Sequence, residues 1–242
     1  MNKKEFYNSL SQNYDSMIDF EAALIRRMDM LKQFAAGKKS ALDFGCGTGL
    51  DSIALAKLEL QVKAYDISNE MISKAKKNAD RHSVKIDFNS MLSIKELETE
   101  SLDLIVSLGN TIANIDSYKL SVIINDFKEK LKKHGTLLIQ LLNFNLYSVG
   151  ESYTINSKDT GTEIIERLYS VKENKIEFLI KTTDKISGSA NSIATDLYPH
   201  QKEFFAGLQS SSKFGTYFYG NLSLEPFEEK ASNDLVVLIK KF

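Results

Sequence analysis

The sequence predicts an α/β fold, in which a mostly parallel sheet carries helices on both faces. Over residues 38–146, short apolar runs alternate with segments whose apolar residues recur every three or four positions. A glycine-rich turn at residues 45–49 joins the first apolar run to the first periodic segment. Alternation is lost over residues 147–198 and returns towards the end of the chain. We therefore expect one sheet with an antiparallel β insertion after its fifth strand.

The first strand and the turn after it indicate a ligand site. Residues 41–44 are a short, mostly apolar run, and an apolar-periodic helix begins at Leu50. Gly45, Gly47 and Gly49 allow a sharp turn and leave no Cβ in the way of a ligand. The free N–H groups of the following helix point at the same place. Such a loop binds a cofactor that contains a nucleoside.

Two acidic residues narrow the choice of cofactor. The dinucleotide fingerprint does not fit, because Leu50 stands where its third glycine belongs, and no Gly-Lys pair forms a phosphate loop. Asp43, at the end of the first strand, would repel a pyrophosphate and attract an ammonium group. Asp66 ends the next apolar run, where its carboxylate can accept hydrogen bonds from both ribose hydroxyls. Together they predict a nucleoside without phosphates.

Residues 43–49, Asp-Phe-Gly-Cys-Gly-Thr-Gly, followed by Asp66, resemble the signature of the class I S-adenosylmethionine-dependent methyltransferases. The resemblance covers residues 38–145 firmly and residues 197–242 loosely. It implies a Rossmann-like, mostly parallel seven-stranded sheet whose last strand is antiparallel and inserted beside its neighbour. It also implies S-adenosyl-L-methionine as the cofactor and S-adenosyl-L-homocysteine as the product.

The resemblance and the strand ends together give a set of expected cofactor-binding residues. They are Asp43, Gly45, Cys46, Gly47, Thr48, Gly49, Asp66, Ile67, Met71, Ser90, Met91, Leu92, Leu108, Gly109 and Asn110. Ile67 and Met71 fit the adenine pocket of the family. Many relatives have an acid near position 90 that meets the adenine amino group. This chain has Ser90, so its hydroxyl or the backbone of Met91 and Leu92 would replace that contact.

Several features favour a small-molecule acceptor. Residues 108–111, Leu-Gly-Asn-Thr, resemble the corresponding segment of glycine and sarcosine N-methyltransferases and their small-molecule relatives. The Asn/Asp-Pro-Pro-aromatic motif of nucleic-acid methyltransferases is absent. The 31 basic residues nearly balance the 32 acidic ones, so no overall field attracts a polyanion. Two alternatives stay open: an acceptor macromolecule such as tRNA or protein, and a module that binds the cofactor or its product without catalysis.

The chemistry requires few catalytic side chains. Methyl transfer from a sulfonium is an in-line displacement, which is accelerated mainly by alignment and exclusion of water. An amine acceptor would also have to be neutral, and a nearby base can ensure this. Candidates near predicted strand ends or the N-terminal helical segment are Tyr14, Asn110, Asn143, His200 and Tyr219. The histidines are not paired as in a zinc site, so no metal is expected.

Length and composition indicate the number of domains and the cellular compartment. The chain has 242 residues, of which 43% are hydrophobic, enough for one domain with an insertion. Cys46 is the single cysteine, which fits a reducing compartment and excludes an intrachain disulfide. No base is placed near Cys46 to activate it, so we expect it to pack and not to act as a nucleophile. Residues 1–5 lack an apolar signal core, and no stretch is long and apolar enough to cross a membrane. A cytoplasmic protein is expected.

The predicted organisation has three parts. Residues 1–37 form an N-terminal helical lid, with one helix over residues 5–36. Residues 38–146 and 197–242 form the methyltransferase domain. Residues 147–196 form the antiparallel insertion, with two strands around residues 173–174. The insertion either shapes the substrate pocket or makes a dimer contact, and both can hold, so a homodimer is possible.

Smaller elements follow from the same patterns. They are a third strand at residues 84–88, a helix at 117–132, a turn at 133–135 before a strand at 136–142, and a helix at 199–208 that begins with a proline.

Overall fold

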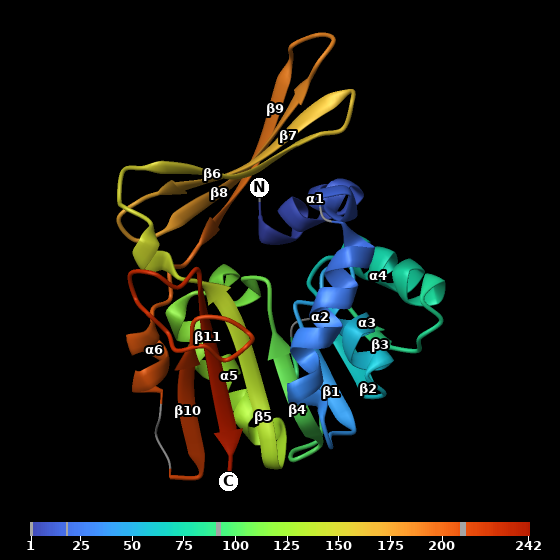
Figure 1. Ribbon diagram of the computed structural model, residues 1–242, viewed down its shortest axis with the longest axis vertical. Coiled ribbons are helices and arrows are strands. Elements are labelled where there is room, and N and C mark those ends of the chain that lie inside the picture. Colours follow the sequence, from blue (N-terminus) through green and yellow to red (C-terminus); the bar gives the residue numbers. More distant parts are fainter. Residues whose placement is uncertain (1, 18, 91–92, 209–211) are drawn as a thin grey trace.

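The structure is a computed structural model that describes residues 2–17, 19–90, 93–208 and 212–242, with the side chains of residues 12–17 left out of the description. It contains a large sheet flanked by helices and a smaller sheet that stands beyond one end of it (Figure 1).

The large sheet has seven strands in the order β10-β11-β5-β4-β1-β2-β3. The strands are β1 (Ser40–Phe44), β2 (Gln61–Tyr65), β3 (Asp87–Asn89), β4 (Leu102–Ser107), β5 (Leu131–Leu142), β10 (Phe214–Tyr219) and β11 (Asp234–Lys241). Strands β1 to β5 pair in parallel, whereas β11 runs antiparallel to both β5 and β10. The predicted Rossmann-like fold, including the inserted antiparallel last strand, is confirmed.

Helices cover both faces because successive strand residues point to opposite sides. On β5, Leu137 and Ile139 pack in a cluster with α5 (Ser117–Lys130) and α6 (Lys202–Gly207). The intervening Leu138 packs in a second cluster with α2 (Phe20–Ala35) and α3 (Leu50–Lys57). Each fully buried aliphatic side chain of this kind contributes about 1.5–3 kcal/mol relative to exposure. The alternating apolar strands thus hold two helical layers on one sheet. The helix α4 (Asn69–Arg81) follows β2.

The smaller sheet has four antiparallel strands in chain order. They are β6 (Ser152–Asp159), β7 (Glu163–Val171), β8 (Ile176–Asp184) and β9 (Ala190–Leu197). Strands β7 and β8 are the hairpin expected around residues 173–174, and β6 and β9 add one strand on each side. Figure 1 shows this sheet beyond the carboxyl end of β5, with α1 (Lys3–Met17) beside it.

The single helix expected over residues 5–36 is wrong, because two helices occupy this segment. The first, α1, ends at Met17, and the second, α2, begins at Phe20. Asp19 separates them: its backbone is extended, and its carboxylate accepts a hydrogen bond from the Ala22 N–H. Because the helix is interrupted, α2 can pack in the core while α1 contacts α4 and β9.

Other boundaries also differ from the prediction. The third strand begins at Asp87 and not at residue 84, because its ladder with β2 spans only three residue pairs. The expected turn at residues 133–135 lies inside β5, where His134 adopts a left-handed conformation and the pairing with β4 is irregular. The helix expected from Pro199 begins at Lys202, after the extended Gln201, and the one expected over residues 117–132 ends at Lys130.

Candidate active site

The glycine turn between β1 and α3 has a backbone that needs glycine. Gly45, Gly47 and Gly49 have φ values of 81°, 54° and 91°, in the left-handed region. A Cβ on Gly45 would overlap the side chain of Thr111, whereas a Cβ on Gly47 would meet nothing within 4 Å. The Gly45 and Cys46 N–H groups both donate to the Tyr65 carbonyl, at 2.7 and 3.0 Å. The turn is therefore fixed to the end of β2 and open at Gly47.

Asp66 lies at the end of β2, directly beside this turn. Its Oδ2 accepts from the Gly47 N–H and its Oδ1 from the Ser68 N–H, both at 2.9 Å. Burial raises the pKa of Asp66, and these two hydrogen bonds oppose the increase. Each carboxylate oxygen still has acceptor capacity for a hydroxyl group. The carboxylate is thus held in place and keeps free lone pairs, which a group that accepts hydrogen bonds from ribose hydroxyls requires.

Asp43 lies one layer behind the turn. Its Oδ2 accepts a hydrogen bond of 2.5 Å from the Ser52 hydroxyl of α3, and only 1% of the residue is exposed. Burial, with the negative charge of Asp51 adding to it, raises the pKa of Asp43 to about 8. Asp51 in turn lies 2.7 Å from the Arg27 guanidinium of α2. Asp43, expected to attract an ammonium group, therefore does not line the cavity, and its raised pKa leaves the carboxyl group largely uncharged near neutral pH.

The end of β4 forms the second loop of the site. Gly109 and Asn110 both have positive φ, and a 3₁₀ helix, η1 (Thr111–Asn114), follows. The Thr111 hydroxyl lies 3.2 Å from the Gly45 carbonyl and 3.0 Å from the Leu108 carbonyl, which ties this loop to the glycine turn. The Asn110 Oδ1 accepts from the Leu142 N–H at 3.2 Å. Two strand ends thus form one surface, as expected at the carboxyl edge of a parallel sheet.

A cavity of about 440 Å³ lies over this surface. Its floor includes Gly45, Gly47, Asp66, Ile67, Met71, Gly109, Asn110 and Thr111. Its opposite side comes from α1, η1 and the smaller sheet, and includes Lys3, Tyr7, Asn114, Arg167, Tyr169, Phe178, Leu197 and Tyr198. This volume lies in the range of small-molecule sites. The floor contains three glycines and one carboxylate, whereas the opposite side contains two cations and several aromatic rings, so the two sides suit different ligands.

The helix α1 closes the cavity by contacting η1 and the smaller sheet. The Tyr7 hydroxyl and the Asn114 side-chain amide are hydrogen-bonded, at 2.9–3.1 Å. The Phe6 ring packs against Phe178 of β8, with ring centroids 5.6 Å apart. The Lys3 ammonium donates to the Asp196 carbonyl of β9. Within the segment predicted to be a lid, α1 contributes residues to the cavity, whereas α2 packs in the core.

The structure brings about half of the expected cofactor-binding residues to the cavity. Gly45, Gly47, Asp66, Ile67, Met71, Gly109 and Asn110 line it. Asp43, Cys46, Thr48, Gly49 and Leu108 are not among the lining residues, and of these all but Gly49 support the two loops as buried side chains. Ser90 is exposed after β3 and does not line the cavity. Met91 and Leu92 lie outside the described residues. Burial raises the pKa of the Cys46 thiol well above its usual range, which argues against a nucleophilic thiolate.

Among the catalytic candidates whose side chains the structure describes, only Asn110 lines the cavity. The Asn143 amide donates to the carbonyls of Glu229 and Ser232, where it holds the loop before β11. The His200 ring is hydrogen-bonded at 2.7 Å to the Ile115 carbonyl, and burial lowers its pKa. Tyr219 ends β10 and packs against the core. The side chain of Tyr14 lies outside the described part of the chain.

Several cavity residues escaped the sequence analysis. Thr111 and Asn114 follow the Leu-Gly-Asn segment, so their spacing on one turn of helix offered a signal. Arg167 and Tyr169 offered another, because they share the inward face of β7 with the buried Ile165.

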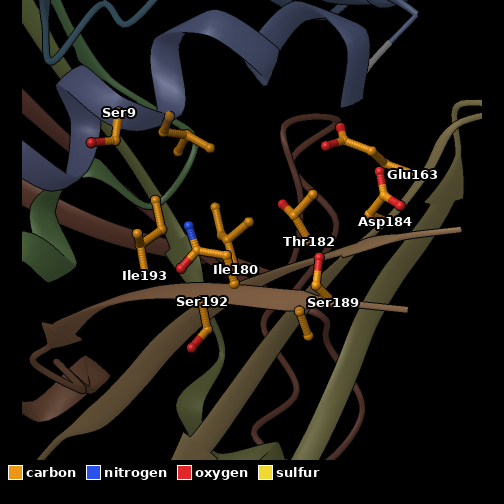
Figure 2. Close-up of a pocket in the computed structure, with 11 residues that line it drawn as sticks. Ser9, Glu163, Ile180, Thr182, Asp184, Ser189, Ser192 and Ile193 are labelled. Atoms are coloured by element: carbon orange, nitrogen blue, oxygen red, sulfur yellow. The ribbon is translucent and has the colours of Figure 1, made fainter. Parts of the chain in front are cut away.

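A second cavity, of about 330 Å³, lies between α1 and the outer part of the smaller sheet (Figure 2). Hydroxyl groups of Ser9, Thr182 and Ser189 line it, and Glu163 and Asp184 lie together at one end. No residue of the glycine turn lines it, so it is separate from the expected cofactor site.

Among the described residues, no group of three or more His, Cys, Asp or Glu side chains is arranged to hold a metal ion. None of the described helices has both the length and the apolar character needed to cross a bilayer.

The known proteins to which this chain is similar include several methyltransferases. Residues 41–135 match the family described as a methyltransferase domain. The chain is 32% identical to the ribosomal protein L11 methyltransferase of Campylobacter concisus, over 65% of this chain and 52% of that protein. It is 28% identical to the ubiquinone biosynthesis O-methyltransferase of Burkholderia vietnamiensis, over 62% of this chain and 65% of that protein. The chain thus spans about half the length of the first of these curated relatives.

Among solved structures, the CcbJ methyltransferase from Streptomyces caelestis has the same fold. Its TM-score is 0.82 over 100% of this chain and 99% of that one, at 16% identity. The fold and the two strand-end loops define a Rossmann-like methyltransferase domain. The matched residues 41–135 identify a methyltransferase domain, and solved structures with this fold include one described as an S-adenosylmethionine-dependent methyltransferase from Clostridium acetobutylicum, with a TM-score of 0.76 and 16% identity over 97% of this chain and 98% of that one.

Proposed function

We propose that this protein catalyses methyl transfer from S-adenosyl-L-methionine to a small-molecule acceptor, and that S-adenosyl-L-homocysteine is the product. One observation carries the proposal. A single cavity extends from Asp66 and the glycine turn to the side chains of α1 and the smaller sheet. A donor on the floor and an acceptor on the opposite side would therefore meet within one enclosed space.

The floor offers the contacts that an adenosyl group needs. The Asp66 carboxylate would accept the ribose hydroxyls, since two backbone N–H groups already fix its orientation. Ile67 and Met71 would flank the adenine with apolar surface. Gly47 would let the cofactor approach the backbone, because nothing lies within 4 Å of the position of its missing Cβ.

Alignment and exclusion of water would supply most of the acceleration. The bound cofactor supplies an electrophilic methyl group on a sulfonium. The protein must hold the acceptor in line with it, and a well-aligned pair gains about 7–11 kcal/mol from orientation. Tyr7, Tyr169 and Phe178 cover the cavity with large side chains that would keep bulk water out. No step of this chemistry requires a metal ion.

The small-molecule acceptor is supported by the covering of the cavity. The relatives named above include one whose name specifies a ribosomal protein and one whose name specifies ubiquinone biosynthesis. In this chain, α1 is hydrogen-bonded to η1 and to β9 across the cavity. A folded macromolecule would have to displace α1 to present a side chain there, whereas a small molecule would not.

A radiolabelled methyl assay tests the proposal. The protein is incubated with labelled S-adenosyl-L-methionine and a cell extract separated by size into metabolites, protein and RNA. We expect label in the metabolite fraction. Label only in protein or RNA would overturn the small-molecule acceptor. Calorimetric binding of S-adenosyl-L-homocysteine without turnover on any fraction would indicate a binding module, and an absence of binding would remove the cofactor assignment.

A further inference from the structure

Strand β7 carries two charged residues on its apolar face: Glu163 at its start, which lines the second cavity, and Arg167 in its middle. Every second residue of a strand points to the same side, and Ile165, Tyr169 and Val171 on this side are at most 7% exposed. Arg167 stands among them and is only partly buried, and its side chain lines the active-site cavity. Arginine is seldom placed on such a face unless its charge is paired or used.

The guanidinium of Arg167 has a neutral partner. Its Nε donates to the Asn156 Oδ1 of β6 at 2.7 Å. In the described part of the chain, no carboxylate lies within 4.0 Å of it. The neighbouring Glu166 points to the other face, where it pairs with Lys181 at 3.4 Å. Partial burial of an unpaired guanidinium costs free energy, and an anion in the cavity would recover that cost.

The other charges at this end leave a net positive field. The Asp116 carboxylate is paired with Lys119 at 3.1 Å. The Lys3 ammonium donates to the Asp196 carbonyl, while the Asp196 carboxylate pairs with Lys175 at 2.8 Å. Lys3 and the arginine are therefore two cations on the cavity wall without a described carboxylate partner in ion-pair contact. Desolvation by burial lowers the pKa of Lys3 to about 8, which leaves much of its charge at neutral pH.

We propose that Arg167 binds an oxyanion of the methyl acceptor, so that the acceptor is a small molecule with a carboxylate or a phosphate group. This inference rests on the proposed function. The Arg167 Nε donates to Asn156, and this hydrogen bond fixes the plane of the guanidinium. The two terminal nitrogens are left for a bidentate contact with two oxygens of the anion. Tyr169 and Phe178 would contact the apolar body of the acceptor.

Probe binding to the complex with S-adenosyl-L-homocysteine tests this. Benzoate, phenyl phosphate and the uncharged benzamide are titrated against the saturated protein, and the melting temperature is followed. We expect at least one anion to raise it and benzamide to have no effect. The anion that stabilises the protein identifies the carboxylate or the phosphate. No stabilisation by either anion, or equal stabilisation by benzamide, would overturn the inference.

Variants show whether the arginine is responsible. Arg167→Gln should weaken binding of the stabilising anion by roughly tenfold or more. Arg167→Lys keeps the positive charge but lacks the planar guanidinium, so it should lose less affinity for the anion. It also serves as a second variant in case Arg167→Gln does not fold. Lys181→Gln removes a positive charge from the opposite face of the same sheet and should bind the anion as the wild type does.

The cofactor provides the last control. Binding of S-adenosyl-L-homocysteine should be unchanged in Arg167→Gln. A roughly tenfold loss there would mean that the guanidinium holds the carboxylate of the cofactor itself, and the inference would fail. If the wild type does not bind S-adenosyl-L-homocysteine, the proposed function fails. If the cofactor binds but the anions bind equally to Arg167→Gln and the wild type, only the present inference fails.

Discussion

The two sides of the cavity are built in different ways. The floor comes from the carboxyl ends of β1, β2 and β4, and it includes three glycines, the Asp66 carboxylate and the apolar side chains of Ile67 and Met71. The opposite side comes from α1, η1 and the strands β7 to β9, and its ligand-facing groups are side chains. The floor is rigid because each loop is hydrogen-bonded to a neighbouring strand end. The opposite side is held by contacts between separate elements.

This difference separates two tasks. A cofactor that many enzymes share can be bound largely through backbone groups, and this requires only a few glycines and one acidic residue. An acceptor that differs from enzyme to enzyme is better recognised by side chains, because these can be substituted without altering the fold. We therefore expect changes to the floor to affect folding or cofactor binding, and changes to the opposite side to affect the acceptor. Four predictions test this expectation, in order of decreasing effect.

The largest effect is expected for Gly45→Ala. A Cβ there would overlap the side chain of Thr111, and the residue would also adopt a left-handed conformation, at a combined cost of about 3 kcal/mol. Gly47→Ala is the matched control, because the same backbone conformation occurs without a close neighbour, and about 1 kcal/mol is expected. Urea unfolding measures both. Equal losses would show that contact with Thr111 does not constrain the turn.

Asp66→Ala should weaken binding of the cofactor product by about 2 kcal/mol, since charge-assisted hydrogen bonds to the ribose would be lost. Isothermal titration calorimetry with S-adenosyl-L-homocysteine measures this loss. Asp87→Ala, which removes an exposed carboxylate of β3, serves as the control and should bind normally. Unchanged affinity in the Asp66 variant would remove this residue from the cofactor site.

Asp43 should make stability depend on pH. Its pKa in the folded protein is raised from 3.8 to about 8, so the folded state holds the proton more tightly than the unfolded state. The stability from this group is complete below the unfolded pKa and is lost as pH rises towards the folded pKa. Between about pH 5 and about pH 8, the wild type should therefore lose on the order of 1 kcal/mol or more relative to Asp43→Asn. Parallel stability curves in urea unfolding would contradict this.

Tyr7→Phe should have the smallest effect and should act on the acceptor side alone. It removes the hydrogen bond between α1 and Asn114, at a cost of about 1 kcal/mol. Hydrogen exchange in α1 should become faster and the KM for the acceptor should rise a few-fold, while the affinity for S-adenosyl-L-homocysteine stays the same. Tyr118→Phe alters a tyrosine that is 80% exposed and is the control. A loss of cofactor affinity in Tyr7→Phe would mean that the two sides are coupled.

Much of the floor could be predicted from the sequence because it is local. Residues 41–49 contain a strand, a turn and a helix start, and each follows from apolar pattern and glycine spacing. Asp66 is one strand-helix-strand step away, so the parallel topology predicts its place beside the turn. The alternating pattern also predicted a mostly parallel sheet with helices on both faces. It was less accurate at the ends of elements, where Asp19 and Gln201 place helix boundaries that periodicity alone does not define.

The sequence by itself determined the class of fold and the turn and acid on the floor of the cavity, since these depend on short patterns whose geometry the chain fixes nearby. Only the tertiary structure decided which side chains line the acceptor side. Tyr7, Asn114 and Arg167 are far apart in the sequence, and they line one cavity because α1 and the smaller sheet close over the strand ends. The same packing left Asn143 and His200 outside the cavity, where they hold loops through hydrogen bonds to backbone carbonyls. Such contacts depend on how distant elements pack, which no local pattern encodes.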